Sequence, residues 1–179
     1  MKITLPSRQL FDEQNQKFVY EEEVEIDIEH SLWTISKWEE DYCKPFLTDK
    51  TTEEDLLSYI PYMDIKGNLN SNSAIFKRIK NDPEALRLIT EYINAPHTAT
   101  TFSKKTKDSG RGKKEILTAE VIYYYMIAME IPFECEHWHL NKLMTLIHVC
   151  GIKNDPKKMS KKDTAAHYAA LNKARRGKL

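Results

Sequence analysis

Cysteine and histidine side chains gather in one short part of the sequence, C-E-H-W-H, which spans Cys135–His139. Thiolate sulfur and imidazole nitrogen are ligands that zinc prefers, and His148 and Cys150 follow nearby. The spacing matches no structural zinc pattern, however, because such patterns pair C-x2-C with a second ligand pair some distance away. His137 and His139, two positions apart, would also diverge on a helix. We therefore expect hydrogen-bonded side chains here and neither a metal nor another cofactor.

The sequence contains no other pattern that is typical of catalysis. No signature surrounds any of the cysteines that would indicate a Cys–His nucleophile. The paired carboxylates Glu39–Glu40 and Glu53–Glu54 fall in acidic runs, which solvated helix starts explain. The S-G-R-G segment (residues 109–112) lacks both the glycine spacing and the preceding strand of a phosphate-binding loop. We expect a protein without enzymatic activity.

Opposite charges concentrate at the two ends of the chain, although the formal net charge is zero. Residues 1–64 carry 16 acidic and 6 basic side chains, whereas the last 27 residues carry 2 acidic and 9 basic ones. Residues 103–114 add six basic side chains against one acidic. Such a polarised chain could fold its tail onto its own acidic part, meet another subunit head to tail, or bind an acidic partner.

The basic loop and tail are therefore the candidate partner-binding segments. Nucleic-acid binding prefers aromatic side chains or a groove-fitting helix beside the positive charge, and the tail contributes only one aromatic residue. We accordingly favour a protein partner, with homo-oligomer formation as a further possibility. The candidate partner-binding residues are Lys104, Lys105, Arg111, Lys113, Lys114, Lys157, Lys158, Lys161, Lys162, Tyr168, Arg175 and Arg176.

The elements that must position these segments centre on Ile116–Cys150, the longest apolar-rich stretch. Apolar residues recur there at helical spacing on both sides of Pro132, which predicts two helices that meet at a corner. Thr118 is the expected N-cap of the first helix, and Gly151 is expected just past the end of the second. The predicted core residues are Val121, Ile122, Tyr125, Met126, Met129, Trp138, Leu140, Leu143, Met144 and Ile147.

The N-terminal part predicts β-structure, at Lys2–Leu5, Phe18–Tyr20 and Val24–Ile28, with a polar turn over Asp12–Lys17 and a solvated edge at Glu21–Glu23. Leu32, Trp33 and Ile35 could extend a strand or begin a helix capped by Ser31. Further helices are indicated by capping signals. Two of these signals are the pairs Ser36–Glu39 and Thr51–Glu54. A third is Asp82–Pro83–Glu84, which should begin a helix that runs to Tyr92 or Ile93 and buries Leu86, Ile89 and Ile93. Lys66–Ser73 reads as a polar loop, and the alanine-rich stretch after Ser160 reads as a helix.

Together these patterns predict a mostly helical α+β protein with a small N-terminal antiparallel β element, a helical body and a basic C-terminal helix. We expect one domain over residues 1–152, β-rich over 1–35 and helical over 36–152, followed by a basic arm over 153–179. The 41% hydrophobic content can supply a core, while no uncharged apolar run approaches the roughly 18 residues of a membrane span. Three cysteines and no apolar leader indicate a cytoplasmic protein with reduced thiols.

Four segments, in the same order, carry a resemblance to a known family. They are EHSLWTISKWEEDYCKPFL (Glu29–Leu47), EYINAPHTATTF (Glu91–Phe102), EILTAEVIYYYMIAMEIPFECEHWHLNKLMTLIHVCGIKN (Glu115–Asn154) and KKMSKKDTAAHYAALNKARRGKL (Lys157–Leu179). The most distinctive piece is WHLNKLMTLIHVC (Trp138–Cys150). These segments resemble the tail assembly chaperones of tailed bacteriophages. The N-terminal strands and the loop Lys66–Ser73 fall outside the resemblance.

The resemblance implies a non-enzymatic factor, made in the cytoplasm of an infected bacterium, that binds tape-measure and tail-tube proteins during virion morphogenesis. An exposed apolar groove could shield the amphipathic helices of a long tape-measure protein. Two alternatives remain open: a structural virion or connector protein, and a small nucleic-acid-binding protein that acts through the basic loop and tail.

The charge pattern generates a first prediction, that Ser160–Lys178 serve protein contact or intramolecular packing rather than nucleic-acid binding. We expect duplex DNA and single-stranded RNA to bind the intact protein too weakly to saturate at near-physiological salt. Titration of the intact chain, beside a chain that ends at Asn154, measures this. Micromolar or tighter binding that disappears with the tail and weakens steeply with salt would contradict it, because counterion release marks phosphate contacts.

Overall fold

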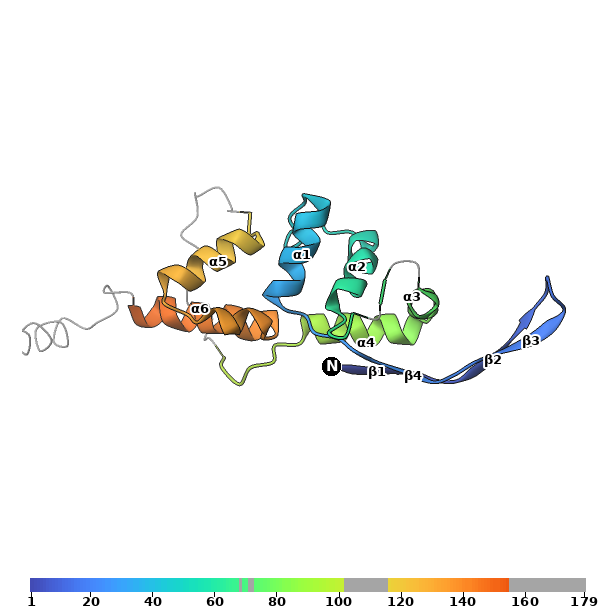
Figure 1. Cartoon of the computed structure of the whole chain (residues 1–179). Coiled ribbons are helices and arrows are strands. Elements are labelled where there is room, and N and C mark those ends of the chain that lie inside the picture. Colours follow the sequence, from blue (N-terminus) through green and yellow to red (C-terminus); the bar gives the residue numbers. More distant parts are fainter. Residues whose placement is uncertain (68, 71–72, 102–115, 155–179) are drawn as a thin grey trace, which may run out of the picture.

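The computed structural model describes residues 1–67, 69–70, 73–101 and 116–154. These residues form a mostly helical α+β structure with a small antiparallel strand element in its N-terminal part (Figure 1). This confirms the expected fold class, while the predicted basic C-terminal helix lies outside the described residues. The helices are α1 (Leu32–Tyr42), α2 (Glu53–Tyr59), η1 (Ile60–Met63), α3 (Ala74–Lys80), α4 (Pro83–Asn94), α5 (Ala119–Ala128), η2 (Phe133–His137) and α6 (Leu140–Asn154). Within the described ranges, no helix has the length and apolarity that a membrane crossing requires.

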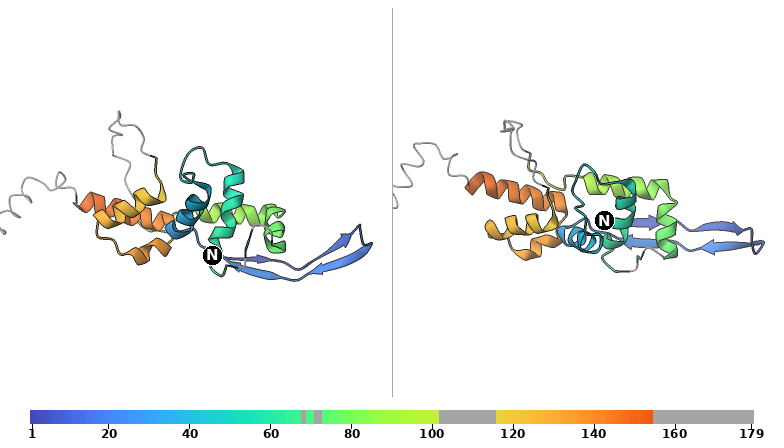
Figure 2. Two further views of the ribbon diagram at one scale, coloured as in Figure 1. Left: turned by 45° about the horizontal axis from the view of Figure 1, so that its top comes forward. Right: turned by 90° about the horizontal axis from the view of Figure 1, so that it is seen from above.

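Four strands form a long antiparallel ribbon that is interrupted near its middle. β1 (Lys2–Leu5) pairs with β4 (Val24–Asp27), and β2 (Arg8–Asp12) pairs with β3 (Lys17–Glu21). The first pair buries Ile3, Leu5, Ile26 and, just beyond β4, Ile28 in the core, as the alternating pattern predicted. The second pair projects from the body as a free hairpin (Figures 1 and 2). The sequence analysis did not predict β2.

Arg78 of α3 fills the interruption in the ribbon. Its Nη1 and Nη2 donate to the carbonyl oxygens of Glu22 and Pro6, at 2.8 Å each. Its Nε lies 3.1 Å from a carboxylate oxygen of Glu21. The guanidinium is buried, so these oxygens replace its lost water and fix where the hairpin leaves the body.

The sequence predicted a solvated acidic edge over Glu21–Glu23, and this is wrong for Glu21, which Arg78 binds. Glu22 and Glu23 are exposed, but the Glu21 carboxylate is partly buried between Arg78 and Arg8, whose Nε lies 2.6 Å away. Helix α3 was not predicted, because its N-cap, Ser73, was assigned to the preceding polar loop. The Ser73 hydroxyl oxygen accepts the Phe76 N–H.

Helix α1 lies at the centre of the body and contacts α5, η1 and η2. Leu32, Ile35 and Trp38 are fully buried, and the Trp38 Nε1–H donates to Ser58 Oγ at 2.9 Å. Of the two readings left open for this stretch, the structure has the helix that Ser31 caps. The helical part therefore begins at Leu32, four residues before residue 36, where it was expected to begin.

The capping signals were correct in kind and displaced in position. Ser31 and Thr34 form the reciprocal capping box of α1, which replaces the predicted Ser36–Glu39 pair. Thr52 and Asp55 form the box of α2, one residue after the predicted Thr51–Glu54 pair. Several neighbouring hydroxyl and carboxylate side chains could serve each start, and the register of the buried face decides which one does.

The predicted helix pair on either side of Pro132 is confirmed. Helix α5 ends where Glu130 takes a left-handed backbone conformation (φ 55°), and the Ile131 N–H bonds back to the Met126 carbonyl at 2.8 Å. Leu143 and Ile147 are buried as expected, but Trp138 is exposed and packs under Lys142. The second helix also continues past Gly151 to Asn154, so the expectation that Gly151 follows its end is wrong.

Glu39 joins two segments that are 80 residues apart. Its Oε1 accepts the Phe46 N–H and its Oε2 accepts the Ala119 N–H, each at 2.7 Å. Ala119 is the first residue of α5, so Glu39 provides the cap that was predicted for the Thr118 hydroxyl, which makes no capping bond. Beside it, Leu47 and Leu117 form an isolated antiparallel bridge. Burial raises the pKa of Glu39 above its ordinary value, and the two backbone donors partly offset this.

We predict that Glu39→Gln lowers the free energy of unfolding by about 1–3 kcal/mol, because an amide offers one acceptor oxygen to two buried N–H groups. Chemical denaturation of the full chain measures the change. Glu40→Gln is the matched control, since the neighbouring side chain is exposed and pairs only with Lys37 at 3.5 Å; it should shift stability by less than about 0.5 kcal/mol. Equal effects of the two substitutions would show that Glu39 does not link the segments.

Candidate protein-binding surfaces

Cys135, His137 and His139, the residues of the conspicuous C-E-H-W-H segment, have different surroundings. The Cys135 thiol is buried in η2, whereas His137 is exposed beside Glu136 and Trp33. The His139 ring is buried and turns toward other elements. The described residues contain no group of three or more His, Cys, Asp or Glu side chains that could hold a metal ion.

His139 caps α6 and fixes its own tautomer. Its Nδ1 accepts the Asn141 N–H at 3.2 Å, and its Nε2 lies 3.1 Å from the Tyr92 carbonyl oxygen. Nδ1 can accept only when it carries no proton, so the ring is neutral with its proton on Nε2. The start of α6 is also bonded to the residue before Ser31, since the Leu140 N–H donates to the His30 carbonyl oxygen at 2.8 Å.

The imidazole ring of His139 packs against two other imidazole rings. The His30 ring lies 5.3 Å away and the His97 ring 3.9 Å away, with the Tyr92 ring at 4.9 Å. His30 Nδ1 shares a hydrogen bond of 2.9 Å with the Tyr59 hydroxyl. Burial and the neighbouring histidines lower the pKa of His30 to about 3, and burial likewise lowers the pKa of His139. His30 and His139 are therefore buried, uncharged residues at neutral pH, while His97 is exposed at the edge of the cluster.

Helix α5 carries an apolar surface that the described elements do not cover. Its residues Ile122 and Met126 are buried against the body, while Tyr124 and Ile127 on its other side are 64% and 62% exposed. Phe133, just after the corner, is also exposed and packs 6.2 Å from the Tyr123 ring. A helix that is apolar all round is normally buried all round, so this exposed side indicates a contact site.

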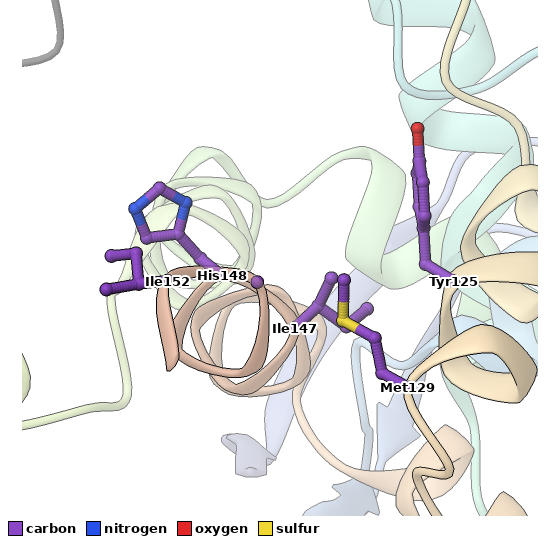
Figure 3. A pocket seen from close by; sticks show the side chains of 6 residues that line it. Tyr125, Met129, Ile147, His148 and Ile152 are labelled. Carbon is purple, nitrogen blue, oxygen red and sulfur yellow. The ribbon is translucent and has the colours of Figure 1, made fainter. Parts of the chain in front are cut away.

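A shallow groove of about 260 Å³ runs between α5 and α6, lined from α5 by Tyr125 and, just after the helix, by Met129. Met129 and Ile147 point toward one another across it, and Tyr125, His148 and Ile152 lie along its rims (Figure 3). Gly151 has no side chain to fill the space beside Met129, where an added Cβ would lie 3.6 Å from the Met129 methyl carbon. The glycine that was expected to end α6 therefore keeps this groove open.

The projecting hairpin forms a second apolar surface. Phe11 and Phe18 pair across β2 and β3 with their ring centroids 5.1 Å apart, and Tyr20 lies on the same face. Phe18 and Tyr20 are each 66% exposed, and Leu10 and Val19 are exposed on the opposite face. An isolated two-stranded hairpin is only marginally stable in water, so a contact partner would stabilise this arm.

Neither surface was among the predicted site residues. The predicted partner-binding residues Lys104, Lys105, Arg111, Lys113, Lys114, Lys157, Lys158, Lys161, Lys162, Tyr168, Arg175 and Arg176 all lie outside the described residues. A signal for the hairpin was present in the sequence: adjacent apolar pairs, Leu10–Phe11 and Phe18–Val19, flank a polar turn, which places apolar side chains on both faces. For α5 the signal was the charged residue Glu120, which lies four and seven positions before the exposed Tyr124 and Ile127 and therefore on the same side of the helix.

No family model, curated protein or solved structure matches the chain.

The histidine cluster generates a prediction for stability at acidic pH. Because the folded pKa of His30 lies below the unfolded value of 6.5, the unfolded chain takes up a proton first as the pH falls. The free energy of unfolding should therefore decrease below pH 6.5, with His30 contributing about 1.4 kcal/mol per pH unit until about pH 3 and His139 acting in the same direction.

Denaturant titrations of the full chain between these pH values measure this dependence. His139→Asn keeps a capping side chain that does not titrate, and should make the dependence shallower. His137→Gln, at an exposed position of the same segment, should leave the dependence unchanged. The opposite ranking of the two variants would mean that the cluster is not the cause.

Proposed function

We propose that this protein is a non-enzymatic protein-binding factor that acts as a tail assembly chaperone of a tailed bacteriophage. Its partners would be the tape-measure or tail-tube proteins, in the cytoplasm of the infected bacterium. Two lines of support are independent of each other. One is the resemblance of Glu29–Leu47, Glu91–Phe102 and Glu115–Asn154 to that family. The other is the uncovered apolar side of α5, and this observation carries the proposal.

The surface of α5 suits the recognition of amphipathic helices. Such a helix presents apolar side chains at every third or fourth position, and it binds by laying this face into an apolar groove. Tyr124 and Ile127 supply exposed contact area, and Met129 lines the groove between α5 and α6. The unbranched, flexible Met129 side chain can adjust to different side chains in the groove. A tape-measure protein offers many similar helical segments, so adaptable contacts are an advantage.

The proposed chaperone keeps aggregation-prone partner segments soluble until they assemble. Apolar patches of this kind otherwise favour self-aggregation, and the charged character of the remaining surface opposes it. The corner at Pro132 holds the two sides of the groove in one arrangement, because α5 and α6 are joined through η2 and both pack on the body. A preformed groove loses less conformational entropy on binding than a flexible segment does.

Co-expression with a tape-measure protein tests the proposal. We predict that Ile127→Asp reduces the soluble tape-measure protein recovered with the chaperone by about tenfold, because a carboxylate would be desolvated in an apolar contact. Ile65→Asp is the matched control: Ile65 is also 62% exposed but follows η1, away from the groove. It should retain full recovery, and both variants should keep the melting temperature of the parent. Unchanged recovery with Ile127→Asp would remove α5 as the contact surface.

Mass spectrometry of purified virions separates this function from a structural role. A chaperone leaves the assembly and should be absent from the finished particle. A fixed copy number per virion would instead establish a structural or connector protein and overturn the proposed function. Saturable nucleic-acid binding through the tail, measured as described above, would overturn it in favour of the other alternative.

A further inference from the structure

The projecting hairpin combines exposed aromatic rings with negative charge. Residues 8–23, the hairpin and the two residues after it, carry five acidic side chains against two basic ones. The basic residue Arg8 is paired with Glu21, with its Nε 2.6 Å from the carboxylate. The acidic side chains of Glu13, Glu22 and Glu23 are exposed. The aromatic face of Phe11, Phe18 and Tyr20 lies among these carboxylates. A partner that fits this arm must therefore present positive charge and a few apolar groups.

The chain itself contains a segment of this composition. Residues 155–179 carry eight basic side chains against two acidic ones, together with the apolar residues Tyr168 and Leu171. Arginine and lysine bind both carboxylates and the faces of aromatic rings, so one segment can satisfy both features of the arm. Its formal charge of +6 is opposite in sign to the −3 of residues 8–23.

The shape of the molecule decides between the chain's own hairpin and that of a neighbour. Helix α6 ends at Asn154 at one end of the elongated molecule, and the β2–β3 hairpin forms the other end in every view (Figures 1 and 2). Residues 155–179 would have to run back along the whole molecule to reach the hairpin of the same chain. The hairpin of a second copy can approach Asn154 directly.

We propose that the protein associates head to tail, with the basic segment 155–179 of one copy bound to the acidic, aromatic hairpin of the next. Arg78 holds the hairpin away from the body at the break in the ribbon, where Glu22 and Glu23 lie exposed beside it. The two surfaces in contact differ, so the association is heterologous and can continue into a ring or an open chain. A contact made largely by opposite charges at the surface depends on ionic strength.

Charge reversal in the full-length chain tests this contact. Sedimentation velocity of the unmodified protein should show association that increases with concentration and decreases between about 0.05 M and 0.5 M salt. Glu22→Lys/Glu23→Lys should raise the dissociation constant at least about tenfold, and so should Arg175→Glu/Arg176→Glu, because each places like charges opposite one another. Glu53→Lys/Glu54→Lys makes the same charge change at exposed positions at the start of α2 and should have no such effect.

A mixing experiment distinguishes head-to-tail association from other modes. The hairpin variant keeps a basic tail and the tail variant keeps an acidic hairpin, so an equimolar mixture should form a complex that neither forms alone. Melting temperatures equal to that of the parent confirm that the variants fold. A protein that is monomeric at every concentration, or association that both variants retain, would refute the proposal. Docking within one chain would appear as a tail-dependent change in tyrosine fluorescence without association, and would likewise refute it.

Discussion

The burial of the Glu39 carboxylate is the constraint on which the arrangement of the helices depends. A buried carboxylate is unfavourable unless its oxygens accept hydrogen bonds, and here each oxygen accepts one backbone N–H. One of these donors follows α1 and the other begins α5, so the requirement of a single side chain brings the two segments together. With α5 fixed on α1, its Ile122 side is buried and its Ile127 side is left uncovered. The proposed contact surface is thus a consequence of how Glu39 is satisfied.

Arg78 has the corresponding role for the strand ribbon. Strand pairing stops between Leu5 and Arg8, and the carbonyl oxygens at that break need donors other than a neighbouring strand. Arg78 supplies them from α3 and also binds Glu21. The hairpin can therefore project from the body without depending on its own marginal stability for its direction. In both places a buried charged side chain satisfies backbone groups that regular secondary structure leaves unpaired.

The two surfaces differ in chemistry, and this difference suggests a division of roles. The α5 surface is apolar and lies beside a groove, which suits the helices of a partner that must be kept soluble. The hairpin is acidic and aromatic, which suits a basic segment such as the tail of a second copy. Occupation of one surface leaves the other available, so copies linked through their hairpins could present successive grooves along an extended partner. The histidine cluster brings together the start of α1, the end of α4 and the start of α6.

Local patterns in the sequence determined the elements whose causes are local. The apolar spacing on both sides of Pro132, the Asp82–Pro83–Glu84 start of α4 and the alternation of Val24, Ile26 and Ile28 each describe interactions within a few residues, and the structure has these elements. The capping boxes were displaced by one to five residues, because several neighbouring side chains have the same capping ability. Only the tertiary structure decided that Glu39 caps α5, that Arg78 closes the ribbon and that His139 joins two other histidines. The partners in these contacts lie from about 40 to about 110 residues apart, and no periodicity within one element encodes which distant backbone group a polar side chain will meet. In α5 apolar residues occur on every side and a single charged residue, Glu120, lies on the exposed one. Burial of one side and exposure of the other were decided by what packs against the helix.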